Sequence, residues 1–125
     1  MKLNDYSLWT ALVTPFTPGL KVDFKSLENL VKEQDSAGNG LLILGSTGEA
    51  LNLDLETRKS IVEFVISMKP KSPIMIGVGG HLLSAQLGWT KWLESQNIDA
   101  YLMVTPIYAK PGDDGQTAWF KTLMD

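Results

Sequence analysis

The chain has 125 residues, 44% of them hydrophobic and 20% charged, which is ordinary for one globular domain. Its formal net charge of −3 argues against a broad nucleic-acid surface, and the lack of cysteine excludes disulfides, thiolate nucleophiles and cysteine-based metal sites. Only one histidine is present, which excludes histidine-rich metal sites, and we expect no metal site. No apolar run is long enough to cross a bilayer, and the first residues lack the apolar core of a signal peptide. We therefore expect a cytoplasmic protein without nucleic-acid or membrane partners.

The first two predicted units each consist of an apolar strand followed by an amphipathic helix. Residues 11–13 are a candidate strand, and Asp23 is a candidate N-cap for the first helix. Residues 41–44 form the next candidate strand, and residues 57–68 the next helix, which ends before Pro70. The apolar positions expected to face the sheet are Phe24, Leu27, Leu30 and Val31 in the first helix, and Ile61, Val62, Val65 and Ile66 in the second.

The third and fourth units follow the same plan. Residues 74–76 and 101–104 are candidate strands. Ser84 is a candidate N-cap for a third helix, and a fourth helix is expected to begin near Gly115 and to continue to the last residues. The apolar positions expected to face the sheet are Ala85, Trp89, Trp92 and Leu93 in the third helix, and Trp119, Phe120 and Leu123 in the fourth.

The four units repeat at a nearly constant interval, since their strands start 30, 33 and 27 residues apart. Each strand is almost continuously hydrophobic, which is typical of parallel strands buried on both faces. Two architectures are built from such units, an open doubly wound sheet and a closed (β/α)8 barrel. A barrel needs about 250 residues. The repeat alone therefore leaves both open and favours a four-stranded open sheet.

Small and polar residues gather where each predicted strand ends, at the sheet edge that holds the active site in such folds. In the segment 45–49, Gly-Ser-Thr-Gly-Glu, the glycines allow a tight turn whose N–H groups can bind a carboxylate. Ser46 and Thr47 add hydroxyl groups. The same composition also suits an ordinary strand-to-helix turn. Neither a P-loop lysine nor a dinucleotide-binding glycine pattern is present.

Three other side chains in these loops are candidates for acid–base or covalent chemistry. Tyr108 can shuttle a proton at the end of the fourth strand, or it can pack at a rim or subunit contact. His81 is expected to be a surface or capping residue, and Lys110 a solvated lysine.

Taken together, three segments resemble one known family. They are residues 12–16 (Leu-Val-Thr-Pro-Phe), residues 40–50 around the Gly-Ser-Thr-Gly-Glu loop, and residues 104–111 (Val-Thr-Pro-Ile-Tyr-Ala-Lys-Pro). Their order and spacing are similar to those of the pyruvate-dependent class I aldolases of the dihydrodipicolinate synthase and N-acetylneuraminate lyase family. The resemblance implies a (β/α)8 barrel in place of an open sheet, with residues 1–125 as the N-terminal half of a single barrel domain and its first four βα units.

The resemblance also implies roles for four residues. Thr47 would be the main contact to the carboxylate of pyruvate, with Ser46 and Gly48 in the same binding loop. Ser46 and Tyr108 would form part of a proton relay, with Tyr108 reaching in from a neighbouring subunit. The third relay residue, a tyrosine on the fifth strand, and the Schiff-base lysine on the sixth strand would lie outside this chain.

The reaction implied is the condensation of pyruvate with aspartate semialdehyde through a Schiff-base enamine, a lyase step of lysine biosynthesis. It needs no cofactor, because pyruvate itself is the covalently bound substrate. Residues 105–111 are more similar to the synthases than to the neuraminate lyases. The alternatives are a sugar-acid aldolase, such as an N-acetylneuraminate or 2-keto-3-deoxygluconate lyase, and a non-catalytic half-barrel that binds ligands or assembles. We expect the complete protein to form a homo-oligomer, a dimer or tetramer, and this chain alone to be inactive.

Overall fold

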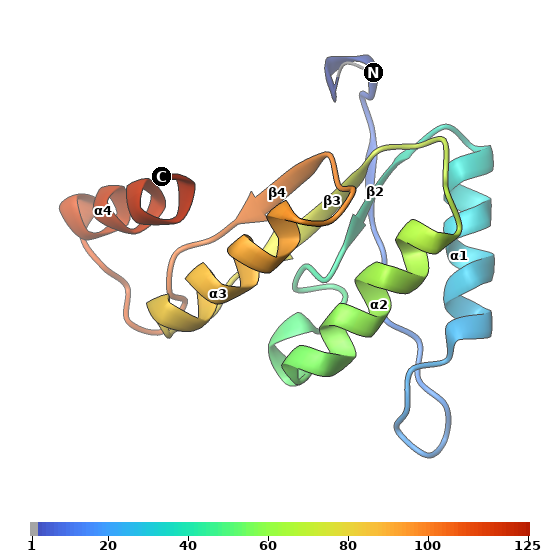
Figure 1. Ribbon diagram of the computed structural model, residues 1–125, viewed down its shortest axis with the longest axis horizontal. Helices are drawn as coiled ribbons and strands as arrows, with labels where there is room; N and C mark the ends of the chain where they lie inside the picture. The colour runs from blue at the N-terminus through green and yellow to red at the C-terminus, as the bar shows by residue number, and fades with distance from the viewer. Residues whose placement is uncertain (1–2) are drawn as a thin grey trace.

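The computed structural model describes residues 3–125 and contains one parallel four-stranded sheet (Figure 1). The strands are β1 (Trp9–Ala11), β2 (Gly40–Ile43), β3 (Ile74–Val78) and β4 (Ala100–Met103). The α-helices are α1 (Phe24–Ser36), α2 (Leu55–Ser67), α3 (Leu83–Glu94) and α4 (Asp113–Met124), and two short 3-10 helices are η1 (Leu3–Asp5) and η2 (Ala50–Asn52). Each strand pairs in parallel with the next one along the chain.

The order of the strands distinguishes the two architectures that the repeat left open. Spatial order follows chain order, β1-β2-β3-β4. Helices α2 and α3 lie in front of the strands, with α1 and α4 at the two sides (Figure 1). A doubly wound sheet reverses its strand order and carries helices on both faces, whereas a (β/α)8 barrel keeps sequential order with its helices outside. The chain therefore has the fold of the first four βα units of a barrel.

The two faces of the sheet differ in burial. Strand residues that face the helices are buried, namely Leu41, Ile43, Ile74, Ile76 and Val78. On the opposite face, which no α-helix of residues 3–125 covers, apolar side chains remain exposed: Val13 by 50%, Leu102 by 42% and Val104 by 40%. We expected both faces of the strands to be buried. In residues 3–125 only the helix-covered face is buried.

Carboxylate caps start the first two helices. Asp23 accepts a hydrogen bond from the N–H of Ser26 at 3.0 Å, which confirms it as the N-cap of α1. Asp54 accepts from the N–H of Thr57 at 2.7 Å, so α2 begins at Leu55, two residues earlier than predicted. These caps satisfy backbone N–H groups that have no partner within the helix.

Two further predicted boundaries were wrong, that of β1 and the start of α3. Strand β1 lies two residues before the predicted run at 11–13. Helix α4 begins at Asp113, near Gly115 as predicted. Ser84 caps nothing, because α3 begins at Leu83 after Leu82, without a side-chain cap.

The buried face of α3 also differs from the prediction. Its buried positions are Gln86, Trp89, Thr90 and Leu93, a stripe at i, i+3, i+4 and i+7. Ala85 lies off that stripe and is exposed, contrary to the prediction, and Trp92 is half-buried at its margin. None of the helices described within residues 3–125 is long and apolar enough to span a membrane.

Candidate functional site

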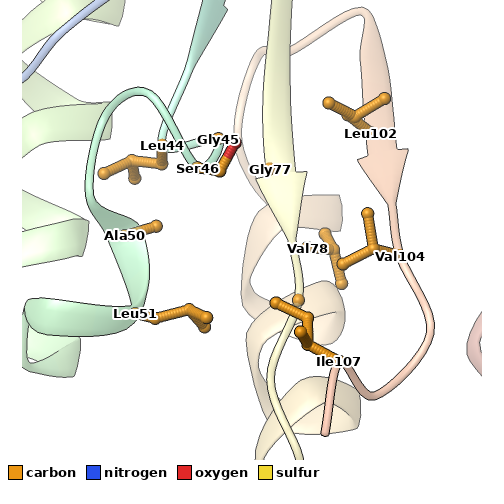
Figure 2. Close-up of a pocket in the computed structure, with 11 residues that line it drawn as sticks. Leu44, Gly45, Ser46, Ala50, Leu51, Gly77, Val78, Leu102, Val104 and Ile107 are labelled. Carbon is orange, nitrogen blue, oxygen red and sulfur yellow. The ribbon is translucent and has the colours of Figure 1, made fainter. Parts of the chain in front are cut away.

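A cavity of about 250 Å³ opens at the carboxyl ends of β2, β3 and β4 (Figure 2). Its walls come from the loop after β2, the end of β3 and the loop after β4. Most of the side chains that line it are apolar: Leu44, Leu51, Val78, Leu102, Val104 and Ile107. Ser46 supplies the only side-chain oxygen among the lining residues (Figure 2). The cavity is therefore suited to a small molecule with an apolar part and few polar groups.

The Gly-Ser-Thr-Gly-Glu loop begins with a sharp change of direction. Strand β2 ends at Ile43, and Leu44 adopts a left-handed conformation with φ of 57°, which is uncommon for a residue with a side chain. The chain then crosses strand β3 at Gly77, where an added Cβ would lie 1.9 Å from the carbonyl oxygen of Leu44. Only glycine at this position allows the loop to take this path.

The far side of the loop contacts the segment that follows β1. The hydroxyl of Thr14 donates a buried hydrogen bond of 2.7 Å to the carbonyl of Gly48. An added Cβ on Gly48 would lie 3.1 Å from the carbonyl oxygen of Leu12, so the two segments pack backbone to backbone. The loop is thus held between β1 and β3.

Two backbone hydrogen bonds close the turn. The N–H of Glu49 donates to the carbonyl of Ser46 at 3.0 Å, and the N–H of Ala50 donates to the carbonyl of Gly45 at 3.4 Å. Glu49 also has a positive φ, of 56°. The side chains of Ser46 and Thr47 are exposed at the tip of this turn, where a ligand can reach them.

The structure brings three of the four predicted site residues together. Ser46, Thr47 and Gly48 share one loop, with Ser46 lining the cavity and Gly48 buried beneath it. Thr47 is exposed and is not among the lining residues. Tyr108 lies apart on the loop after β4, where it is 89% exposed, and no hydrogen bond within residues 3–125 joins it to Ser46. Its neighbour Ile107 lines the cavity instead.

The other loop candidates lie at the surface, as expected. His81 and Lys110 are both exposed. No side chain that lines the cavity is titratable, and the described residues contain no cluster of three or more potential metal ligands. Among the described residues, the cavity lining offers the hydroxyl of Ser46 but no amine that could attack a carbonyl.

Sequence reasoning missed two residues that shape the site. From the sequence, Thr14 appeared only within the segment 12–16, and Gly77 was not singled out. Both act through contacts with the loop at residues 44–48, which are distant in sequence. The glycine-rich composition at 77–80 was a signal for close backbone approach, but it could not indicate which segment approaches.

The fold and the site together define a (β/α)8-barrel protein with a small apolar cavity and a glycine-rich loop at the carboxyl edge of its strands. Residues 5–125 match the dihydrodipicolinate synthetase family, and the chain belongs to this family.

Similar proteins agree with this assignment. The 4-hydroxy-tetrahydrodipicolinate synthase of Francisella philomiragia is 50% identical over 118 residues, which are 94% of this chain and 40% of the relative. A dihydrodipicolinate synthase described as a monomeric variant is 31% identical, with a TM-score of 0.84 over 94% of this chain and 40% of its own. A chloride-inhibited dihydrodipicolinate synthase from Acinetobacter baumannii, solved with pyruvate, is 32% identical, with a TM-score of 0.88 over 94% of this chain and 41% of its own. The chain thus spans about two-fifths of the length of these relatives.

Proposed function

We propose that the complete protein condenses pyruvate with aspartate semialdehyde through a Schiff-base enamine, and that residues 1–125 are the N-terminal half of its single barrel domain. The observation that carries this proposal is the loop at residues 44–50, which closes over an apolar cavity and presents Ser46 to it. The identity of 50% to a 4-hydroxy-tetrahydrodipicolinate synthase supports the same activity.

The loop suits the carboxylate of pyruvate. The hydroxyl of Thr47 is the proposed main contact, and the N–H groups around Ser46 and Gly48 are the proposed further donors. A carboxylate that accepts such bonds gains more than a neutral acceptor would. The apolar walls formed by Leu44 and Val104 suit the methyl group of pyruvate. The Acinetobacter relative, solved with pyruvate, supports this substrate class.

The proposed nucleophile is a lysine outside residues 1–125. No lysine lines the cavity formed by the described residues. A Schiff-base lysine needs an apolar surrounding, which favours its neutral, nucleophilic form. The cavity supplies that surrounding. Because the Schiff base itself activates pyruvate, the proposed reaction uses no cofactor and no metal.

Tyr108 and Ser46 are the proposed proton relay. With 89% of its surface exposed, Tyr108 is free to reach a second copy of the protein. We therefore propose that the complete protein works as a homo-oligomer, a dimer or tetramer. We also propose that it acts in the cytoplasm.

The test is reduction with borohydride in the presence of pyruvate, followed by mass spectrometry. We expect a stoichiometric adduct on one lysine beyond residue 125 in the complete protein and none on isolated residues 1–125. An adduct on a lysine of the isolated chain would refute the assignment of roles. A complete protein that forms no adduct would instead identify a non-catalytic barrel. Turnover with a sugar-acid substrate, but not with aspartate semialdehyde, would identify a sugar-acid aldolase.

A further inference from the structure

The carbonyl group of Gly77 lies where strands β2 and β3 part. In a parallel strand, successive carbonyl groups point alternately toward the two neighbouring strands. Earlier in the chain, the carbonyl of Pro73 accepts from the N–H of Leu41 in β2 at 2.9 Å. The same alternation directs the carbonyl of Gly77 toward β2. However, β2 has already ended there, because the chain turns away at Leu44.

A tryptophan from the following helix replaces the partner that β2 no longer supplies. The indole Nε1 of Trp89 in α3 donates a buried hydrogen bond of 3.1 Å to the carbonyl of Gly77. Trp89 is 1% exposed. A buried carbonyl without a donor is strongly unfavourable, so this bond holds the Gly77 peptide in one orientation.

The Gly77 peptide in turn supports the glycine-rich loop. A Cβ added to Gly77 would lie 1.9 Å from the carbonyl oxygen of Leu44 and 2.9 Å from the nitrogen of Gly45. The first peptide of the loop therefore packs directly on Gly77. Both Gly77 and Ser46 line the cavity (Figure 2), so a shift of one displaces the wall that carries the other.

Trp89 is itself held by a stack between α2 and α3. The guanidinium carbon of Arg58 lies 5.0 Å from the centre of the Trp89 ring. The ring of Trp92 stacks on Trp89 with centroids 5.3 Å apart and an interplanar angle of 12°. The Nζ of Lys59 lies 5.8 Å from the centre of the Trp92 ring. These contacts fix the indole and thereby the direction of its N–H group.

The next unit uses the same arrangement. The Nε1 of Trp119 in α4 donates a hydrogen bond of 3.1 Å to the carbonyl of Val104, just beyond the end of β4. Val104 also lines the cavity. In both units, the helix holds the end of the strand that precedes it, on the side of the sheet opposite the cavity.

We propose that Trp89 is a positioning residue for the pyruvate-binding loop: its indole N–H replaces the ladder hydrogen bond lost where β2 ends, and so holds the Gly77 peptide against which the loop packs. This inference rests on the proposed function for its effect on pyruvate. The hydrogen bond and the packing contact are features of this chain itself.

The test replaces Trp89 in the complete protein by β-(3-benzothienyl)alanine, in which sulfur takes the place of the indole N–H and the ring keeps its size. The same replacement at Trp92, in the same stack, is the matched control. We expect the KM for pyruvate to rise about three- to tenfold for the Trp89 variant, which corresponds to one lost hydrogen bond. We expect kcat to stay close to that of the wild type, and the melting temperature to fall, because the buried Gly77 carbonyl loses its donor. The Trp92 variant should leave the KM unchanged.

Hydrogen exchange, read by mass spectrometry without substrate, gives a second readout. Residues 44–50 should exchange faster in the Trp89 variant and at the wild-type rate in the Trp92 variant. Equal effects of the two replacements, or a lower melting temperature with unchanged KM and exchange, would overturn the inference. If the wild type does not consume pyruvate, the proposed function fails, while the exchange rates still decide whether Trp89 holds the loop.

Discussion

Two glycines determine the path of the loop at the site, and each does so by lacking a Cβ at a backbone crossing. At Gly77 the crossing segment is the carbonyl of Leu44, and at Gly48 it is the carbonyl of Leu12. Neither glycine has a positive φ, so what each position requires is space and not an unusual backbone conformation. A methyl group at either position meets backbone atoms, which cannot move aside as a side chain can.

The substitution Gly77→Ala should destabilise the protein and impair the site. The new Cβ would lie 1.9 Å from the Leu44 carbonyl oxygen, so the loop must shift. Overpacking of this kind typically destabilises by about 1–3 kcal/mol. Gly88→Ala in α3 is the control, because no atom lies within 4 Å of its added Cβ and alanine favours a helix by roughly 0.5–1 kcal/mol. In urea unfolding, Gly77→Ala should lower the free energy of unfolding and Gly88→Ala should raise it. A Gly77→Ala protein as stable as the wild type would contradict the close approach of the Leu44 carbonyl to Gly77.

The two proposed roles of hydroxyl groups should separate in kinetics of the complete protein. Thr47→Val should weaken pyruvate binding, since a hydrogen bond to a charged group contributes about 1.5–3 kcal/mol. Tyr108→Phe should instead lower kcat, because loss of a positioned proton-transfer group typically reduces the rate by about 10²–10⁴-fold. Steady-state kinetics with varied pyruvate measures both. If Thr47→Val lowered only kcat and Tyr108→Phe raised only KM, the roles would be misassigned.

At the scale of elements, carboxylates near the ends of helices link stability to pH. The backbone N–H of Thr57, together with its side chain, lowers the pKa of Asp54 below the ordinary value of 3.8. Hydrogen bonds from the side chain and backbone of Ser26 lower the pKa of Asp23 in the same way. Burial by itself raises the pKa of Asp35, but the backbone N–H groups of Ser72 and Lys71 outweigh it, so this pKa is also lowered.

Each of these carboxylates should stabilise the fold at neutral pH and lose that effect in acid. A lowered folded-state pKa means that the contribution is complete above the unfolded value of 3.8 and disappears as pH falls through the folded value. Asp54→Asn keeps an oxygen acceptor for Thr57 but cannot titrate, so its stability should fall less between neutral pH and pH 3. Asp114→Asn, at an exposed position in the first turn of α4, is the control. Urea unfolding across this pH range measures the difference. If the free energy of unfolding changed with pH in the same way for the wild type and Asp54→Asn, the cap would not depend on charge.

Elements with strong local signals were predictable from the sequence, and elements that depend on distant contacts were not. Asp23 started α1 as predicted, because an N-cap acts within its own turn. Strand β1 was displaced because its extent depends on its register with β2, in which Trp9 lies opposite Gly40. In α3 the buried stripe passes through Gln86 instead of Ala85. The polar side chain of Gln86 gave no sign that this residue is buried. Which residues of α3 face the sheet depends on how the helix is placed against it, and the local sequence does not show that.

The site shows the same division. Ser46, Thr47 and Gly48 were predictable as a group because they are adjacent in sequence. The hydrogen bond from Trp89 to Gly77 was not, because it depends on where β2 ends relative to β3. A tryptophan on the apolar face of a helix is usually buried. Nothing in the local sequence shows whether its indole N–H also donates a hydrogen bond to a strand carbonyl.

At the scale of the whole molecule, the uncovered face of the sheet is the dominant feature. Strands β1 and β4 form the two edges of the described sheet, and the face opposite the helices exposes Val13, Leu102 and Val104. In a closed barrel this face points to the interior, where side chains from all strands pack in layers. The proposal that residues 1–125 are half of one barrel domain therefore requires a second set of strands to cover it.

Isolated residues 1–125 should consequently self-associate. Unpaired strand edges and an exposed apolar face favour association, because pairing the edges satisfies backbone groups and burying apolar surface removes it from water. Sedimentation velocity should show dimers or larger species whose proportion rises with concentration. The combined change Val13→Thr and Val104→Thr keeps the side-chain shape but makes this face more polar, so it should shift the distribution toward monomer. Leu20→Asn, at a loop residue that is 85% exposed and whose φ of 59° asparagine tolerates, should leave the distribution unchanged. A monodisperse wild-type monomer that melts cooperatively would show that the sheet is self-contained and would contradict the half-barrel proposal.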